Sequence, residues 1–502
     1  MRRSFTLAFV AFFLLAGAWA LALPINGTYD EKQHIVRAWA VMTGQLVPHQ
    51  RAVDATGYPT DGFTAPRSLL PANPDCTWFP KNDPKPASCL RMVDDRSETT
   101  LASGAGRYSP VYYALVGLPI RMSPDQTGII WARLLSAAIG ALLLAGAVAV
   151  AVRLGNPLLV AAVALVSTPL AMNLNGSINP NGLEISAGVL LFASLLALLR
   201  GQRAADAAAP RWLLALAGTA SALLLTVRNL GPVLFGLAVL ACLIAAAPGR
   251  MRVLARRRAA RWWLGGLTAV GLLFTAVWTY ASRITDIAPL PERSQDLSAG
   301  EILRHILNDR AEFYVRQIVA QFNYGETTVS IGMIAIWYSL VAAVVVPALW
   351  FGDRRLRVAV LGIVFACALL LVGLELYFVP RVGWFSHSRY AMPVGVGAVI
   401  LPAFADRYTQ WLAQRGWLHR LATVLVLATV PLDLYALARV MTRFQRGLDA
   451  GLNPFGGTWQ PPLGPVVPLM TYLVGAVLLA AIVTSSSVRP APQHSTVNTL
   501  SN

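Results

Sequence analysis

A short polar segment that could carry acid–base chemistry, Tyr29-Asp30-Glu31, follows directly after the first long apolar stretch of the chain, and His34 and Arg37 come soon after it. If the segment is helical, Asp30 and His34 share a face, as do His34 and Arg37. Such a cluster could place a general base beside a substrate hydroxyl group. The spacing is equally typical of a helix start, where carboxylates complement the helix dipole. Asp30 with His34 would also supply two ligands of a catalytic metal ion.

Long apolar runs make up most of the remaining chain and must hold this segment in place. Of the 502 residues, 56% are hydrophobic and 13% are charged, whereas about 25% are charged in a typical soluble domain. A run of about 20 apolar residues crosses the hydrocarbon layer as a helix, because a helix satisfies its own backbone hydrogen bonds. The sequence therefore predicts an all-α membrane protein with about twelve transmembrane helices.

The predicted crossings alternate with polar segments. The crossings are residues 5–23, 128–152, 158–174, 182–199, 212–227, 232–247, 262–281, 329–350, 356–379, 390–404, 418–440 and 466–483. The first segment, residues 1–24, resembles a signal peptide, but it is long enough to remain as an uncleaved anchor. It is followed by a large outer loop (25–127), helices two to seven (128–282), a second outer loop with an amphipathic helix (283–328), helices eight to twelve (329–485) and a disordered cytoplasmic tail (486–502).

Within the first outer loop, residues 109–122 form an apolar patch that is too short to cross a bilayer. We expect a helix lying at the membrane interface, with its tyrosines at the depth of the lipid headgroups. Cys76 and Cys89 lie in the same loop, in a proline-rich stretch without a CxxC spacing or a nearby histidine. They are predicted to form a structural disulfide bond outside the cytoplasm. Cys242 and Cys367 lie in apolar runs and are expected to be inert.

Arginines carry most of the formal net charge of +17, and many of them lie in short loops between the apolar runs. Positive charge in such loops marks the cytoplasmic side of a membrane protein. Arg2 and Arg3 therefore hold the amino terminus inside, and six crossings return the arginine-rich loop 248–261 to the same side. We expect a bacterial inner-membrane protein with both termini in the cytoplasm and no nucleic-acid partner.

Four sequence segments carry a resemblance to known membrane proteins: GTYDEKQHIVRAWAVMTGQL, RYSPVYYALVGLP, SINPNGLE and GWFSHSRYAMP. In this order they resemble a bacterial family known as a predicted membrane protein domain of unknown function, DUF2142. That family is similar to the C-type (GT-C) glycosyltransferases, which use polyprenyl-phosphate sugars. The resemblance implies a GT-C-like fold with a large first outer loop. It also implies that an acidic residue just after the first span is the catalytic carboxylate, which corresponds to Asp30 and secondly to Glu31.

A sugar on a polyprenyl phosphate already has a leaving group that needs no protonation, so one base that deprotonates the acceptor hydroxyl is sufficient. The phosphate needs cations, and a guanidinium group can bind it through two hydrogen bonds. Candidates near the outer ends of predicted helices are Arg228, Arg381 and Arg389, with His387 and Tyr390 beside them, and Arg389 is the preferred one. Each arginine is also compatible with a role as an interfacial anchor.

Further candidates for substrate binding lie in the matching segments. His34 follows the acidic pair, and Arg107-Tyr108 precedes the expected interfacial helix, where it would line the acceptor side or start the helix. Asn179 and Asn181 hold amides where the resembling family is associated with carboxylates. Sugar-hydroxyl binding or a turn with a helix cap therefore fits these two asparagines better than a metal site.

Two acidic residues at or within predicted spans, Glu375 and Asp433, are costly to embed in a membrane and are functional candidates for that reason. Pairing with Arg381 and Arg439, respectively, is the simpler expectation, since each arginine lies within two helical turns. Glu326, after the second outer loop, is not placed by the sequence.

The leading hypothesis is a membrane glycosyltransferase that moves a sugar from a polyprenyl-phosphate donor to an envelope glycan, glycolipid or protein. Its expected partners are the lipid-linked sugar and membrane lipid; the sequence implies no particular cofactor, although a divalent cation is compatible with the site. The alternative is a transporter or flippase of lipid-linked saccharides. Such proteins often show internal repeats and charges at the membrane midplane, whereas here the acids gather at the outer rim. A third hypothesis is a noncatalytic scaffold.

Overall fold

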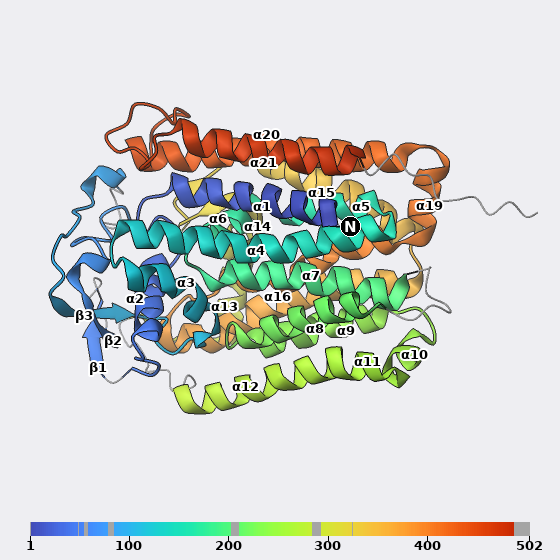
Figure 1. The fold of residues 1–502 in the computed structure, drawn as a ribbon, viewed down its shortest axis with the longest axis horizontal. Helices are drawn as coiled ribbons and strands as arrows, with labels where there is room; N and C mark the ends of the chain where they lie inside the picture. Colours follow the sequence, from blue (N-terminus) through green and yellow to red (C-terminus); the bar gives the residue numbers. More distant parts are fainter. Residues whose placement is uncertain are drawn as a thin grey trace, which may run out of the picture.

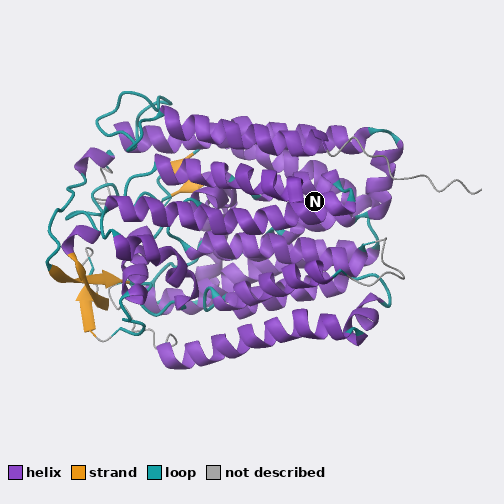
Figure 2. Cartoon of the chain, in the orientation of Figure 1, coloured by secondary structure: helices purple, strands orange, loops and turns teal. Residues whose placement is uncertain are grey.

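The computed structural model describes residues 2–48, 50–54, 59–78, 85–201, 210–283, 293–323 and 325–485. Long helices run side by side through the molecule, and a small β-sheet lies at one end of them (Figures 1 and 2). The predicted disordered tail, residues 486–502, falls outside the described residues.

Eight helices in the described part of the chain are long and apolar enough to cross a membrane. They are α1 (Arg2–Ala22), α4 (Gln126–Leu154), α7 (Pro180–Arg200), the helix Arg258–Ser282, α15 (Ile331–Phe351), α16 (Arg354–Val382), α20 (Trp417–Arg446) and α21 (Val466–Ser485). The helix Arg258–Ser282 consists of α11 (Arg258–Ala260), η4 (Arg261–Gly266) and α12 (Leu267–Ser282). These helices confirm the helical membrane class.

Two further pairs of helices are sharply bent, and each pair could form one broken span. The pairs are α5 (Pro157–Val166) with α6 (Pro169–Asn175), bent by 74°, and α9 (Gly231–Ala245) with α10 (Arg250–Arg256), bent by 119°. Counting each pair once raises the number of candidate spans in the described residues to ten. Two shorter apolar helices, α8 (Arg211–Thr226) and the segment Met392–Phe404, coincide with the remaining predicted crossings. The expected number of twelve spans therefore stays a prediction.

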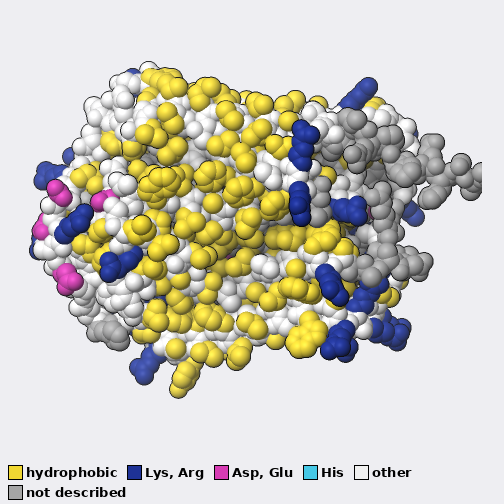
Figure 3. All heavy atoms as spheres, in the orientation of Figure 1, with side chains coloured by type: hydrophobic (Ala, Val, Ile, Leu, Met, Phe, Trp, Pro, Cys, Tyr) yellow, Lys and Arg dark blue, Asp and Glu magenta, His cyan; other side chains and the backbone are white. Residues whose placement is uncertain are grey.

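The segment Met392–Phe404 and its surroundings consist of short turns of helix. They are η6 (Ser388–Tyr390), α17 (Met392–Gly395), α18 (Gly397–Ile400) and η7 (Leu401–Phe404), followed by α19 (Asp406–Gln414). The helix α7 is buried along nearly all of its length, whereas α12 lies at the edge of the bundle (Figure 1), where only Gly271 and Ser282 among its residues are buried. Figure 3 shows hydrophobic side chains across the middle of one face and charged side chains toward its two ends. This banding is what a helical bundle in a bilayer requires.

The first outer loop builds a small domain at one end of the bundle. It contains α2 (Glu31–Met42), η1 (Arg67–Leu69), η2 (Ala87–Cys89), α3 (Pro110–Met122) and an antiparallel sheet of β1 (Gln50–Val53), β2 (Pro59–Pro66) and β3 (Glu98–Ser103), with β2 in the centre. Cys76 and Cys89 form a disulfide bond in this domain, with an S–S distance of 2.06 Å. Loops and short helices at this end cover the ends of α1 and α4 (Figure 1).

The helix expected at the membrane interface is present as α3, and two of its tyrosines are buried inside the protein. Tyr112 and Tyr113 are buried, and α3 packs against α2 and α4. The hydroxyl groups of Tyr112 and Tyr113 lie 2.9 Å from Ser136 Oγ and 2.8 Å from His34 Nδ1. The position of α3 at the membrane interface stays a prediction, whereas the two buried hydroxyl groups lie beside side chains of α4 and α2.

The second outer segment is helical as expected, and it places its polar side chains against the start of α2. It consists of α13 (Ala299–His305), η5 (Ile306–Arg310), α14 (Ala311–Ala320) and the short pair of strands β4 (Gln321–Phe322) and β5 (Thr327–Thr328).

The turn after α6 packs closely against α1. A Cβ atom at Gly176 would lie 2.2 Å from the carbonyl oxygen of Ala16. Glycine is therefore required where this turn meets the first span.

Candidate active site

Asp30 lies immediately before α2 and is held in a left-handed backbone conformation, with φ 56° and ψ 11°. Few residues other than glycine adopt this conformation, although aspartate and asparagine do so more often than others. The backbone carbonyl group of Asp30 accepts hydrogen bonds from Gln33 and His34, but its carboxylate makes no capping bond to the helix. The helix-start interpretation therefore does not account for the carboxylate.

The carboxylate of Asp30 instead forms an ion pair with Arg389. Arg389 Nη2 donates to Asp30 Oδ2 over 2.6 Å, and the two residues are 359 positions apart in the sequence. The guanidinium group of Arg389 also stacks over the ring of Tyr29, 4.2 Å from its centroid. The side chain of Arg389 is 2% exposed and that of Asp30 is 34% exposed. The buried guanidinium group of Arg389 thus contacts a carboxylate, that of Asp30, which is partly exposed.

Arg389 keeps hydrogen-bonding capacity after it has paired with Asp30. Its Nε and Nη1 atoms are buried and find no hydrogen-bond partner among the residues that the structure describes. A buried donor without a partner costs about 1–3 kcal/mol. The remaining N–H groups lie in the plane of the guanidinium group and can donate to the oxygens of an anion such as phosphate.

A second buried guanidinium group, that of Arg228, also contacts the ring of Tyr390. The centroid of the Tyr390 ring is 4.9 Å from Arg228 Cζ and 5.1 Å from Arg389 Cζ. Arg228 Nη1 donates to Glu184 Oε2 over 3.0 Å and also stacks over the ring of Tyr108. The structure therefore gathers two of the three expected arginines around one tyrosine.

Gln317 of α14 fixes the turn that carries Arg389. Its Nε2 donates to the hydroxyl oxygen of Tyr29 over 2.7 Å and lies 3.0 Å from His387 Nδ1, and its Oε1 accepts from the backbone N–H of Ser388 over 2.6 Å. Burial, followed by the charge of Arg389, lowers the pKa of His387, so this imidazole is neutral and its Nδ1 accepts a hydrogen bond from the amide of Gln317. Gln317 was not singled out from the sequence, because nothing in its neighbourhood marks it.

His34 is buried beside the site, but its ring is held by tyrosines rather than by Asp30. Its Nδ1 lies 2.8 Å from the hydroxyl group of Tyr113, and the ring packs against those of Tyr108 and Tyr113. Burial lowers the pKa of His34 to about 3. Within the described ranges, no three histidine, cysteine or acidic side chains come together as a set of metal ligands.

Glu31, the second candidate for the base, is committed to a buried ion pair. Arg133 Nε donates to Glu31 Oε1 over 2.7 Å and Arg133 Nη2 donates to Oε2 over 2.5 Å, while the backbone N–H of Ile178 also donates to Oε1. The same arginine donates to the carbonyl oxygens of Leu23 and Pro24. Both side chains are at most 1% exposed. This pair joins α2 to α4 and the end of α1, and it leaves no free carboxylate oxygen for catalysis.

Asn179 and Asn181, which follow α6, form a helix cap and hydrogen bonds to neighbouring segments. Asn179 Oδ1 accepts from the backbone N–H of Asn181, and Asn179 Nδ2 donates to the carbonyl oxygen of Tyr29 over 2.9 Å. Asn181 Nδ2 donates to Glu184 Oε2 over 3.0 Å. The contacts of the two asparagines therefore fit the turn-and-cap alternative. The same side chains also donate hydrogen bonds to Tyr29 and to Glu184, the partner of Arg228.

Arg107 ties the sheet of the outer domain to the end of α12. Its Nε pairs with Asp61 Oδ2 over 3.2 Å, and its Nη1 donates to the carbonyl oxygen of Arg283 over 2.7 Å. Trp278 Nε1 donates to the carbonyl oxygen of Arg107. The neighbouring Tyr108 contacts both Arg228 and His34, so this dipeptide borders the cluster on the side of α12.

Arg381, the third expected arginine, does not join the cluster. It stacks on Tyr377 and donates to the carbonyl oxygen of the same residue, one turn earlier in α16. The expected pairing of Arg381 with Glu375 is wrong, because Glu375 points inward and pairs with Arg310 at 3.0 Å. The carboxylate of Glu375 also accepts from the hydroxyl group of Tyr314.

The expected pairing of Asp433 with Arg439 is wrong as well. Asp433 accepts a hydrogen bond of 2.6 Å from the hydroxyl group of Tyr472 on α21. Arg439 donates instead to the carbonyl oxygens of Leu448 and Ala450 beyond the end of α20. Both expected pairings were based on proximity in the sequence. They fail because the acidic residue and the arginine of each pair face different neighbours.

Glu326 lies near the cluster but has its own partner. It is 3.6 Å from Arg443 Nη2 and accepts from Asn323 Nδ2. Burial raises the pKa of Glu326. Arg443 also donates to the carbonyl oxygens of Thr77 and Lys85 and so anchors α20 to the disulfide-bonded loop. Sequence reasoning missed Arg443 and Arg133, which had no signal other than a charge at or within an apolar run.

Comparison with solved structures gives distant matches. The crystal structure of ArnT from Cupriavidus metallidurans bound to undecaprenyl phosphate matches with 16% identity and a TM-score of 0.42, over 95% of this chain and 77% of that one. The apo state of the same protein matches with 15% identity and a TM-score of 0.40, over 94% and 75%. The arabinofuranosyltransferase AftD from Mycobacteria matches with 15% identity and a TM-score of 0.41, over 88% of this chain and 26% of that one. TM-scores of this size do not establish a shared fold.

No protein of curated function matches the sequence. The family described as "Predicted membrane protein (DUF2142)" matches residues 12–398, which include Asp30, Arg228 and Arg389. The match covers well over half of the chain, and it agrees with the resemblance seen in the sequence. The protein belongs to the DUF2142 family of membrane proteins.

Proposed function

We propose that this protein is a membrane glycosyltransferase, which moves a sugar from a polyprenyl-phosphate donor to an acceptor hydroxyl group at the outer face of a bacterial inner membrane. The observation that carries the proposal is the contact between Asp30 and Arg389. It combines a partly exposed carboxylate with a buried guanidinium group that has two nitrogen atoms without a partner in the described chain. One group suits proton transfer from a hydroxyl, and the other suits phosphate.

In the proposed reaction, the acceptor oxygen forms a bond to the anomeric carbon of the sugar, and the bond between that carbon and the phosphate oxygen breaks. The electron pair of the broken bond leaves with the phosphate, so the products are the glycosylated acceptor and polyprenyl phosphate. The proton of the acceptor hydroxyl passes to the carboxylate of Asp30. General base catalysis of this kind typically contributes a factor of about 10²–10⁴ to the rate.

The arginines account for the charge that develops on the leaving group. The phosphate gains negative charge as the bond to the sugar breaks, and preorganised cations in a buried site stabilise that charge strongly. Arg389 offers its Nε and Nη1, and Arg228 adds a second positive charge beside Tyr390. His387, Tyr390, His34 and Tyr108 form the walls of the proposed binding site, whereas Glu31 and Arg381 have no part in it.

The arrangement of the bundle supports an outer-face reaction. The cluster forms where α2 and the segment after α16 meet, and α2 lies at the end of the bundle that carries the β-sheet and the disulfide bond (Figure 1). We assign the opposite end, with α10 and its arginines, to the cytoplasm by the positive-inside rule. Twelve crossings with both termini inside complete the proposed topology. The acceptor class is an envelope glycan, a glycolipid or a secreted protein.

The test is transfer of a radiolabelled sugar from polyprenyl phosphate to membrane acceptors by the purified full-length protein. Asp30→Asn keeps the size of the side chain but removes the base, and we expect transfer to fall by a factor of about 100 or more. Asp95→Asn, at an exposed carboxylate of the same outer loop, is the matched control and should transfer at the rate of the wild type. Full activity of Asp30→Asn would exclude Asp30 as the base. Movement of the lipid-linked sugar across vesicles without covalent transfer would support a transporter instead.

A further inference from the structure

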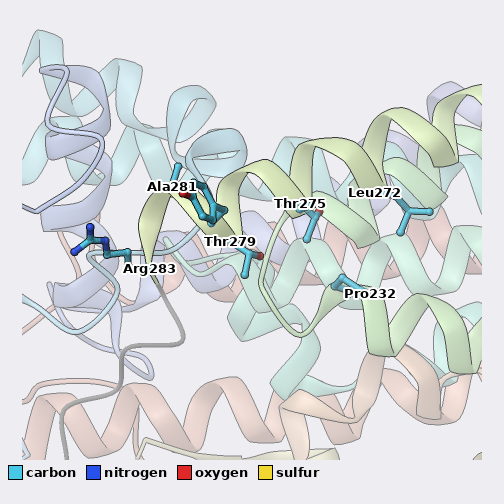
Figure 4. Close-up of a pocket in the computed structure, with 8 residues that line it drawn as sticks. Pro232, Leu272, Thr275, Thr279, Ala281 and Arg283 are labelled. Atoms are coloured by element: carbon cyan, nitrogen blue, oxygen red, sulfur yellow. The ribbon is translucent and has the colours of Figure 1, made fainter.

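A groove of about 890 Å³ runs along the outer half of α12, away from the cluster around Asp30. Figure 4 shows its lining residues in a row, with Leu272 at one end, Arg283 at the other, and Pro232 of α9 facing the row. The groove is lined by Pro232, Leu272, Thr275, Ala276, Thr279, Tyr280, Ala281 and Arg283. Its volume lies within the range of about 300–1,000 Å³ found for pockets that bind small molecules.

The groove exists because α12 packs closely on α8 and leaves a gap toward the start of α9. Thr275 Oγ1 donates to the carbonyl oxygen of Leu225 in α8 over 2.7 Å, and Gly271 lies against the side chain of Leu225. On the other side of α12, apolar side chains face outward, and Leu273 is 67% exposed. Because α12 belongs to a candidate membrane span, the surroundings of this helix are lipid rather than water.

The lining changes from apolar to cationic along the groove. Leu272, Ala276 and Pro232 form the apolar part, the hydroxyl groups of Thr279 and Tyr280 follow, and Arg283 ends the row. The guanidinium group of Arg283 makes no hydrogen bond or ion pair with any residue in the described part of the chain, whereas its carbonyl oxygen accepts from Arg107. A membrane lipid has the same order of groups, with an apolar chain below hydroxyl-bonding oxygens and a charged head.

We propose that this groove binds a membrane phospholipid with a net anionic headgroup, such as phosphatidylglycerol. The phosphate lies against Arg283 and the hydroxyl groups of Thr279 and Tyr280, and an acyl chain runs along Leu272 and Ala276. A zwitterionic headgroup also has a phosphate, but its own cation competes with Arg283 for that phosphate. Binding of this lipid is separate from the proposed sugar transfer.

The experiment compares the lipids that the purified full-length protein retains. The protein is placed in mixed micelles with equal amounts of phosphatidylglycerol and phosphatidylcholine, and bound lipid is counted by native mass spectrometry. We expect the wild type to retain phosphatidylglycerol preferentially. One basic residue near the headgroups contributes enough for Arg283→Gln to reduce this retention about fivefold. Ala276→Trp should fill the apolar part and reduce retention of both lipids.

The controls change the same residue types outside the groove. Arg381→Gln removes an exposed arginine of α16 that does not line the groove, and Leu273→Trp places the same new side chain on an exposed position of α12 outside the groove. Both should bind as the wild type does. Thr279→Val keeps the shape of the groove but removes a hydroxyl group. It therefore tests the polar part of the groove if Ala276→Trp does not fold. Equal retention of the two lipids by the wild type, unchanged retention in Arg283→Gln, or binding of polyprenyl phosphate but not phosphatidylglycerol would overturn the proposal.

Discussion

The side-chain amide of Gln317 and the hydroxyl group of Tyr29 are joined by a hydrogen bond of 2.7 Å, although 288 residues separate them in the sequence. Through this bond the second outer segment contacts Tyr29, which directly precedes Asp30. The other atoms of the same amide reach His387 and the backbone of Ser388, directly before Arg389. Gln317 therefore sets the distance between the proposed base and the proposed phosphate ligand without contacting either of them.

Gln317→Leu should reduce transfer because it releases both ends of this connection and leaves buried groups without partners, at a cost of about 1–3 kcal/mol. We expect kcat to fall by a factor of about 10–100 with a smaller change in KM for the donor. Steady-state transfer kinetics check this expectation. Gln414→Leu, at the exposed end of α19, is the control. Equal losses in both variants would mean that Gln317 has no positioning role.

Arg389→Lys should not restore the function lost in Arg389→Ala. Lysine keeps the charge but cannot present two parallel N–H groups to a phosphate. We expect both variants to lose transfer by a factor of about 100, together with weaker binding of polyprenyl phosphate in a titration. Arg381→Lys and Arg381→Ala, at the exposed arginine that stacks on Tyr377, should behave as the wild type. Wild-type donor affinity in Arg389→Lys would contradict a bidentate contact.

Glu31→Gln should destabilise the protein, because it leaves Arg133 buried with a neutral partner. Breaking a buried ion pair costs about 3–5 kcal/mol, whereas replacing both members by apolar residues is often nearly neutral. Thermal unfolding in detergent should therefore show a lower midpoint for Glu31→Gln and a partial recovery for the double variant Glu31→Leu with Arg133→Met. If Glu31→Gln unfolded as the wild type does but lost transfer, Glu31 rather than Asp30 would be the base.

His34 should make the protein less stable in mild acid. Its pKa is lowered to about 3 in the folded state, so below the usual histidine value of about 6.5 the unfolded chain binds a proton that the folded protein does not. Stability then falls as the pH falls from about 6.5 toward about 3, by up to about 1.4 kcal/mol per pH unit. Unfolding midpoints measured between pH 7 and pH 4 should drop less steeply for His34→Asn. Parallel curves for the two proteins would refute this assignment.

Local sequence patterns were sufficient for the class of fold and for the location of the acidic motif. Apolar runs of bilayer length predict helices because a backbone in lipid must satisfy its own hydrogen bonds, and all predicted crossings coincide with apolar helices in the structure. Asp30 was found for a similar reason, since charged residues directly after such a run are conspicuous. Arg389 was the preferred phosphate ligand among the outer arginines, but its direct contact with Asp30 could not be predicted from the sequence.

The tertiary structure alone decided the partner of each charge. Glu31 and Asp30 are adjacent and have the same chemistry, yet one is sealed against Arg133 inside the bundle and the other meets Arg389 at a partly open site. Local periodicity describes neighbours within about one or two turns, whereas these partners are 102 and 359 residues away. The packing of helices that are far apart in the sequence determines which side chains are desolvated together, and here it buries Glu31 against Arg133 and leaves Asp30 partly exposed beside Arg389.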